Sequence, residues 1–209
     1  MEGPQCGAGI PACHFVENNY TPAIPKNVNW YERRLPHWHP QETSIFLTWM
    51  LKGAIPLHCK HSSFITEDAK LDRSGSGPTY LKDPRCANIV ADAIEYGESG
   101  MHMHRLIAYV VMSNHVHLLI CPVVPIARIT KVLKGYTARE INRLLNRTGQ
   151  PLWQDESFDR WMRGGNDERT VTRYIESNPV TAGLVDNAEQ WLWSTASGKA
   201  GRNACPTLT

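Results

Sequence analysis

Two apolar, β-rich runs joined by a two-residue turn constrain the fold of this chain more than any other feature. Residues 106–112 read LIAYVVM, residues 115–120 read HVHLLI, and the dipeptide Ser113-Asn114 between them is a turn signal. A short connection of this kind favours antiparallel pairing of the runs it joins. We therefore predict a tight β-hairpin. Neither run approaches the length needed to span a bilayer, so we expect no membrane partner.

Further predicted elements flank this hairpin and set the fold class. We expect strands at 44–52 and 157–163, a helix from Pro84 that stops at Gly97 to Gly100, and a second helix from Ile126 with a break near Gly135. The resulting order, β-α-β-β-α-β, is the plan of an α+β, ferredoxin-like sandwich with an antiparallel sheet. Helices would cover one face of that sheet and leave the other face free to carry a site.

An additional C-terminal helix is predicted around the segment YIESNP, residues 174–179. Asp167 can cap this helix, and Pro179 is expected to end it. Tyr174 and Asn178 stand at i and i+4 and therefore share a helix face. An amide oxygen beside a phenol could be a metal ligand next to a nucleophile. The spacing alone favours the simpler interpretation, in which Tyr174 is a packing residue and Asn178 a C-terminal cap.

The composition indicates one globular domain with two peripheral segments. The chain has 209 residues, of which 42% are hydrophobic, and a net charge of +2, which suits a single buried core. Residues 1–40 are predicted to form an extended N-terminal arm, residues 41–196 the main domain and residues 197–209 a flexible tail. The first residues lack a basic segment followed by an apolar stretch, so we expect a cytoplasmic protein.

Three His-x-His pairs stand out, and they differ in their suitability for a metal ion. They are His37/His39, His102/His104 and His115/His117. Side chains at i and i+2 of a strand share a face, about 7 Å apart along it, so two imidazoles can bind one ion. Only the third pair alternates with apolar residues that supply a core face. Prolines flank the first pair and argue against a ladder strand, and the second pair, at a strand entrance, is a weaker candidate.

Two interpretations stay open for these residues. A single buried histidine is most often a hydrogen-bonded structural residue, and two imidazoles are too few for a complete site, so an oxygen ligand must come from elsewhere. Tyr136, in LKGYTARE, is a rival to Tyr174 as nucleophile because it lies in a basic helix. Its i+4 neighbour is Glu140 rather than an amide, and its spacing from Ile129 and Leu133 suits a core contact.

Several sequence blocks, in order, resemble one protein family. They are VVMSNHVHLLI, LKGYTAREINRLL, WQDESFDR and RYIESNPVTAGLV, preceded by WYERRLPHWHP and LDRSGSGPTYLKDPR. Together, over residues 30–196, they resemble the REP-associated tyrosine transposases, which belong to the single-tyrosine HUH transposases. One departure is Ser113, where the family usually has proline. This should alter the rigidity of the turn and not the chemistry.

The resemblance implies a function and a site. It implies that residues 41–196 form a catalytic domain that cleaves and rejoins single-stranded DNA, with hairpin-forming palindromic repeats as the substrate. Tyr174 would be the nucleophile, forming a 5′-phosphotyrosine, and this overrides the packing interpretation. His115 and His117 would bind a divalent metal, Mg²⁺ or Mn²⁺, with Asn178 as the third ligand. Such an enzyme would be nucleoid-associated, as a monomer or a homodimer.

Basic residues suggest where DNA could lie. Six Lys or Arg and a single Glu stand between residues 126 and 147, although a charged helix face is more often simply solvated. The resemblance and the charges together make these residues DNA-contact candidates: Arg33, Arg34, Trp38, Arg128, Lys131, Lys134, Arg139, Arg143 and Arg147.

Other functions remain in view. A rolling-circle replication initiator or relaxase would use the same histidines and tyrosine, but a large initiator is disfavoured because the sequence has no P-loop. A histidine-triad hydrolase would need a third histidine at position 119, where Leu119 stands. A domesticated DNA-binding protein without catalysis is disfavoured by the intact histidines, tyrosine and asparagine.

Overall fold

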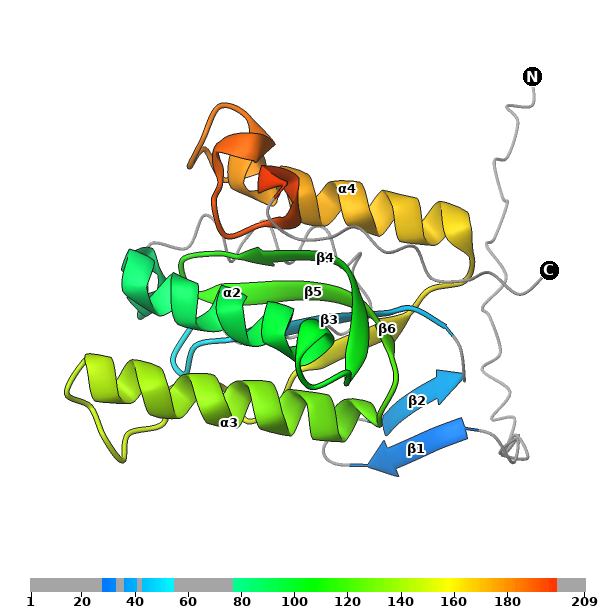
Figure 1. Cartoon of the computed structure of the whole chain (residues 1–209), viewed down its shortest axis with the longest axis horizontal. Coiled ribbons are helices and arrows are strands. Elements are labelled where there is room, and N and C mark those ends of the chain that lie inside the picture. The colour runs from blue at the N-terminus through cyan, green and yellow to red at the C-terminus, as the bar shows by residue number, and fades with distance from the viewer. Residues whose placement is uncertain (1–27, 33–35, 41–42, 55–76, 199–209) are drawn as a thin grey trace, which may run out of the picture.

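A four-stranded antiparallel sheet forms the centre of the molecule (Figure 1). The computed structural model describes residues 28–32, 36–40, 43–54 and 77–198, with side chains from residue 43 onward. The strands are β3 (Ile45–Met50), β4 (His104–Val111), β5 (His115–Pro122) and β6 (Phe158–Trp161), in the spatial order β4-β5-β3-β6. Helix α2 (Pro84–Ser99) connects β3 to β4, and α3 (Ile126–Leu144) connects β5 to β6. This is the predicted ferredoxin-like arrangement, in which β5 separates β3 from β4.

One face of the sheet packs on α2 and α3, which lie side by side (Figure 1). Alternate residues of β3 and β5 point to this face because side chains in a strand alternate between faces. The fully buried members are Ile45, Leu47 and Trp49 of β3 and Val116, Leu118 and Ile120 of β5. They meet Val90 and Ile94 of α2 and Ile129 and Leu133 of α3 in a single apolar cluster. The predicted core face of the histidine-bearing strand is thereby confirmed.

The ends of α2 are as predicted, but α3 does not break. Asp83 caps α2 by accepting a 2.9 Å hydrogen bond from the backbone N–H of Arg85, Pro84 is its first residue, and Gly100 is the C-cap. Helix α3 runs without interruption through Gly135. A glycine costs a helix only about 1 kcal/mol relative to alanine, and the buried apolar residues on both sides of it hold the helix together.

The second face of the sheet, which the fold class alone left free to carry a site, is covered by the last helix. Helix α4 (Gly165–Thr181) packs over β4 and β5 on this face, away from α2 and α3 (Figure 1). Val171 and Ile175 of α4 pack in one cluster with Phe46, Leu119 and other residues of the sheet. Any site on this face therefore lies between the sheet and α4.

Both predicted limits of α4 were wrong. The helix begins after Gly164, and Asp167 instead lies in its first turn, where its carboxylate accepts from Arg163 N–H at 3.2 Å and from the Arg160 guanidinium at 3.0 Å. Pro179 lies inside the helix, which continues to Thr181. A proline so close to the C-terminal end removes a single helical hydrogen bond, and its burial offsets part of that loss.

Shorter elements complete the described structure. Strands β1 (Val28–Glu32) and β2 (Pro36–Pro40) form a separate antiparallel ribbon, so the prediction that His37/His39 lies outside a ladder strand was wrong. The two prolines stand at the ends of β2, where a missing N–H is tolerated. The boundaries at residues 40 and 196 remain predictions. Three 3₁₀ turns are Tyr80–Lys82, Ala188–Gln190 and Thr195–Ser197.

The segment after α4 packs on the edge of the sheet at β4. The Trp191 indole N–H donates to the carbonyl oxygen of Val111 at 3.0 Å, and that of Trp193 donates to Asn88 of α2 at 2.7 Å. Ser194 forms an isolated bridge with Val110 of β4. No helix within the described ranges is both long and apolar enough to cross a bilayer.

Candidate active site

Two imidazoles converge on the α4 side of the sheet. His115 and His117 of β5 point to the same face, and neither has any exposed surface. Their Nε2 atoms are 3.0 Å apart, and their ring centroids are 4.6 Å apart. The rings therefore lean toward one another from neighbouring positions of one strand, as a shared ligand would require.

The outer nitrogen of each ring is held by a neighbouring side chain. Thr48 Oγ1 lies 2.8 Å from His117 Nδ1, and Asn114 Oδ1 lies 2.7 Å from His115 Nδ1. Thr48 is the cross-strand partner of His117 in the β3–β5 ladder, and Asn114 is the last residue of the hairpin turn. The sequence did not reveal Thr48, because the pairing that brings it to His117 spans 69 positions. Asn114 was recognised only as a turn residue.

The predicted nucleophile lies over this pair. Tyr174 of α4 has its ring centroid 5.7 Å from that of His117 and 6.5 Å from that of Phe46. Phe46 itself stacks on His117 at 5.5 Å, with 28° between the ring planes. The Tyr174 ring is partly exposed, while its hydroxyl oxygen is inaccessible to solvent. The structure thus brings the phenol and one imidazole together from elements 57 positions apart in the chain.

Asn178 lies one turn after Tyr174 on α4. Its side chain is 2% exposed, and its Oδ1 atom has no hydrogen-bond partner among the described residues. Its backbone carbonyl accepts from Ala182 N–H at the end of the helix, which is the ordinary C-terminal contact. A buried acceptor without a partner costs about 1–3 kcal/mol, so the packing interpretation does not account for the amide oxygen. A bound cation would supply the missing partner.

These residues fit a divalent cation. Two atoms that each lie about 2.1 Å from one ion, at right angles, are about 3.0 Å apart, which is the observed Nε2–Nε2 separation. No group of three or more His, Cys, Asp or Glu side chains that could hold a metal ion occurs in the described part of the chain, so a third ligand from that part would be of another type. The unpartnered amide oxygen of Asn178 is of the right type, since mixed imidazole and oxygen ligands suit Mn²⁺ or Mg²⁺.

The second His-x-His pair does not converge. His104 is buried, with Nε2 3.2 Å from the carbonyl oxygen of Ile94, and burial lowers the pKa of its imidazole. His102 is exposed and has a positive φ of 49°. Because one ring enters the core and the other faces solvent, His104 is a structural histidine.

The rival nucleophile Tyr136 lies on α3, on the opposite side of the sheet from the imidazoles. Its side chain is 46% exposed, so the predicted core contact was wrong. The Arg139 guanidinium lies over its ring at 5.7 Å.

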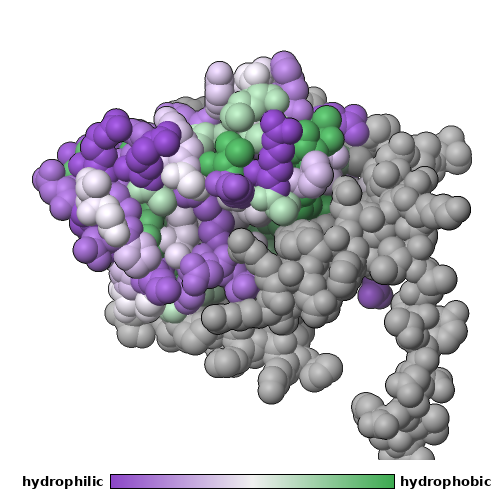
Figure 2. All heavy atoms as spheres, turned by 90° about the horizontal axis from the view of Figure 1, so that it is seen from below, coloured by the Kyte–Doolittle hydropathy of each residue, from purple (hydrophilic) through white to green (hydrophobic). Residues whose placement is uncertain are grey.

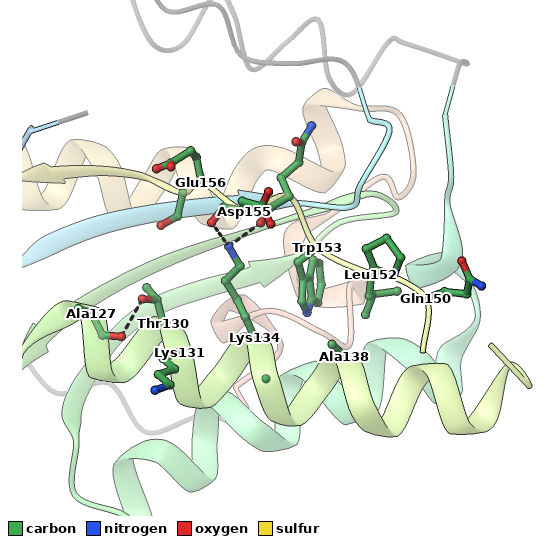
Figure 3. Close-up of a pocket in the computed structure, with 14 residues that line it drawn as sticks. Ala127, Thr130, Lys131, Lys134, Ala138, Gln150, Leu152, Trp153, Asp155 and Glu156 are labelled. Carbon is green, nitrogen blue, oxygen red and sulfur yellow. Dashed lines mark hydrogen bonds between the residues drawn. The ribbon is translucent and has the colours of Figure 1, made fainter. Parts of the chain in front are cut away.

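The candidate DNA-contact residues fall into two groups. The side chains of Arg33, Arg34 and Trp38 lie outside the described residues. The others are on or just after α3, opposite the imidazoles, where Figure 2 shows hydrophilic groups around smaller hydrophobic areas. Several have local partners. Lys134 donates hydrogen bonds to the backbone carbonyls of Gln154 and Asp155 (Figure 3). Arg139 and Arg143 form ion pairs with Glu140. The guanidinium of Arg147 lies over the ring of Tyr80. Arg128 and Lys131 are exposed, and DNA contact by all nine stays a prediction.

The converging residues lie in a segment that is similar to a known protein family. A ferredoxin-like sheet carries a His-x-His pair, and a tyrosine-bearing helix covers it. Residues 84–178 match the family model of the IS200-like transposases. The matched segment runs from the start of α2 to Asn178 and includes both histidines and Tyr174. The resemblance to tyrosine transposases is therefore confirmed over the segment that contains the candidate site.

Among the similar solved structures, one with a TM-score above 0.5 shares this fold. It is a REP-associated tyrosine transposase bound to a REP hairpin, which is 16% identical, with 86% of this chain and 93% of that chain covered and a TM-score of 0.52. Another, a candidate transposase from Deinococcus radiodurans R1, is 22% identical, with 64% of this chain and 88% of that chain covered and a TM-score of 0.37. No curated protein matches the chain significantly.

Proposed function

We propose that this protein is a transposase that cleaves and rejoins single-stranded DNA, with Tyr174 as the nucleophile and a divalent metal at His115, His117 and Asn178. One observation carries the proposal. The phenol ring of Tyr174 is 5.7 Å from an imidazole whose Nε2 atom faces a second Nε2 atom at 3.0 Å. The proposed nucleophile and the two nitrogens proposed as metal ligands are adjacent, in a segment that matches the transposase family.

The proposed reaction is a transesterification. The phenolic oxygen of Tyr174 attacks the phosphorus, the bond from phosphorus to the 3′ oxygen breaks, and the phenol loses a proton while the leaving 3′ oxygen gains one. The products are a 5′-phosphotyrosine and a free 3′-OH. Because one phosphodiester is exchanged for another, the reverse step can rejoin DNA without ATP.

The protein's part is to hold the reacting groups in line. His115 and His117 offer two imidazole nitrogens, and Asn178 offers an amide oxygen. When bound, a divalent ion supplies Lewis-acid stabilisation of a non-bridging phosphate oxygen. Phe46 restrains the ring of His117 by stacking, and α4 positions the phenol over it. Orientation of this kind contributes strongly to the rate.

Access to the site requires a movement of α4. Neither imidazole has exposed surface, and the Tyr174 hydroxyl is also inaccessible. Glycines with positive φ, Gly164 at 135° and Gly183 at 69°, flank the helix on both sides. These backbone positions can absorb a change of direction. We propose that α4 moves away from the sheet when a DNA phosphate enters.

We propose a single-stranded DNA with a hairpin as the substrate. Support comes from the family match of residues 84–178, from the basic face of α3, and from a structural neighbour that is bound to a REP hairpin. Arg128 and Lys131, which are exposed on this helix, would contact phosphates of such a substrate.

The test is a search for the covalent adduct. Hairpin oligonucleotides with single-stranded flanks, taken from palindromic repeats of the host genome and labelled at the 3′ end, are incubated with the protein and Mn²⁺. A 5′-phosphotyrosine carries the label with the protein through denaturing electrophoresis. Tyr174→Phe should form no adduct and should still bind the hairpin. An adduct in that variant would refute the assignment, and binding without any adduct in the wild type would indicate a DNA-binding protein that does not cleave.

A further inference from the structure

We propose that Asn114 and Thr48 are positioning residues that set the tautomers of His115 and His117, and that the Thr48 hydroxyl serves His117 in two alternative roles. Asn114 holds His115 permanently in the form that offers an Nε2 lone pair. Thr48 donates a hydrogen bond to His117 when the site is empty and accepts one when a divalent cation is bound. This inference rests on the metal site proposed above.

Asn114 leaves His115 only one tautomer. An amide oxygen can accept a hydrogen bond but cannot donate one, so the 2.7 Å contact with Asn114 Oδ1 places a proton on His115 Nδ1. The Nε2 atom of the neutral ring then carries a lone pair. Asn114 is 3% exposed, and its backbone oxygen accepts from Leu51 N–H at 2.8 Å. The turn is thereby tied to the end of β3, which keeps the amide in place.

Thr48 permits either tautomer of His117. The two Nε2 atoms are 3.0 Å apart, and two facing lone pairs at this distance would repel each other. Without a cation, His117 must therefore donate from Nε2–H to His115 Nε2, and its Nδ1 accepts from the Thr48 hydroxyl at 2.8 Å. With a cation, both Nε2 atoms must offer lone pairs, so the proton of His117 stands on Nδ1 and is donated to Thr48 Oγ1.

A hydroxyl is well suited to this position. A carboxylate or a carbonyl opposite His117 could only accept a hydrogen bond, which would fix the proton of His117 on Nδ1. The Nε2 lone pairs of His115 and His117 would then face each other whenever the site is empty. A hydroxyl changes from donor to acceptor by rotation about one bond, with no net gain or loss of protons. Thr48 is 1% exposed and opposes His117 in the ladder, and Phe46 stacks on the same ring. The heavy atoms therefore need not move.

The first test measures metal affinity in the full chain. Binding of Mn²⁺ is followed by electron paramagnetic resonance and calorimetry for the wild type, Thr48→Val and Thr48→Ser. Valine keeps the shape but leaves Nδ1–H buried without a partner, so we expect Mn²⁺ affinity to fall about 10–100-fold. Serine keeps the hydroxyl and should restore affinity close to that of the wild type. For His115, Asn114→Ala should weaken binding, and Asn114→Asp, which keeps an acceptor oxygen, should not.

The second test needs no variant. Nitrogen-15 NMR of histidine-labelled wild type reports which ring nitrogen carries the proton. We expect His115 to be protonated at Nδ1 with and without Mg²⁺, and the proton of His117 to stand on Nε2 without Mg²⁺ and on Nδ1 with it. A His117 that keeps one tautomer throughout would overturn the role of Thr48.

The outcomes separate this inference from the proposed function. Equal Mn²⁺ affinity of the wild type and Thr48→Val, with adduct formation intact, would overturn the positioning role alone. A wild type that binds neither Mn²⁺ nor Mg²⁺ would overturn the metal site, and the positioning role with it.

Discussion

The two faces of the central sheet are built from different chemistry. The face toward α2 and α3 is closed by aliphatic and aromatic side chains of β3 and β5, such as Leu47 and Leu118. The face toward α4 has an apolar cluster too, but five polar side chains are buried in or beside it. These are Thr48, Asn114, His115, His117 and Asn178, none of them more than 3% exposed.

This difference suggests that the face toward α2 and α3 mainly stabilises the fold and that the face toward α4 carries the function. Burial of an apolar side chain stabilises a fold by roughly 1.5–3 kcal/mol, while a buried polar group costs free energy unless it is hydrogen-bonded. The α4 face keeps its polar groups in a chain of contacts, from Thr48 to His117 and from Asn114 to His115, and leaves the amide oxygen of Asn178 without a partner. A face kept only for packing would not need them. The predictions below test this division of roles.

The largest effect on stability is expected on the helix face. Leu118 is completely buried there, so Leu118→Ala should lower the free energy of unfolding by about 2–5 kcal/mol. Urea denaturation followed by circular dichroism measures the change. Val123→Ala is the control, because Val123 is 64% exposed and should change the free energy of unfolding by no more than about 0.5 kcal/mol. A small loss for Leu118→Ala would mean that this face does not dominate stability.

The next largest expected effect is the stabilisation of the folded protein by a metal ion bound on the α4 face. A ligand that binds only the folded state stabilises it by about 2.7 kcal/mol at 100 times its Kd. Mn²⁺ at that excess should therefore raise the free energy of unfolding of the wild type by this amount. His117→Gln removes one ligand and should abolish most of the gain. If this variant gained as much stability from Mn²⁺ as the wild type, the ion would not be held by the histidine pair.

Local patterns in the sequence predicted the helix-face half of the molecule well. The alternation in residues 115–120 identified both the apolar face and the histidine face of β5, because a strand has a fixed period of two. Pro84 and Gly100 marked the limits of α2 through their backbone preferences. The position of Tyr174 in the last helix was also predicted, although its assignment as nucleophile came from the family resemblance and is still a proposal.

Other features of the fold depend on tertiary contacts and could not be predicted from local sequence patterns. The pairing of Thr48 with His117 depends on the register of two distant strands, which no local pattern encodes. Gly135 and Pro179 were expected to interrupt helices, but packing overrides these local costs. Amphipathic spacing shows that a helix packs without showing which face of the sheet it covers, so the placement of α4 over the histidine face was expected only from the family resemblance.

A smaller effect is expected from pH at the structural histidine. Burial lowers the pKa of His104 below its unfolded value of 6.5, so the folded state favours the neutral ring. Above pH 6.5 the His104 ring is neutral in both states, and the folded state keeps its full stability. As the pH falls from 6.5 through the lowered pKa of the folded state, the unfolded state binds a proton first and the free energy of unfolding decreases. Unfolding measured from pH 7.5 downward should show this loss in the wild type, and a weaker one in His104→Gln. Equal pH dependence in the two proteins would show that His104 does not titrate in this way.

The smallest effect is expected at the rival tyrosine, and it bears directly on which face is functional. Tyr136 is 46% exposed on α3, and Tyr136→Phe keeps the ring beneath the Arg139 guanidinium. We expect a change in unfolding free energy within about 0.5 kcal/mol and an unchanged yield of covalent DNA adduct. Tyr174→Phe, the same chemical change on the other face, should abolish the adduct. If instead Tyr136→Phe abolished it, the nucleophile would lie on the helix face, and the buried imidazoles beneath α4 would need a different explanation.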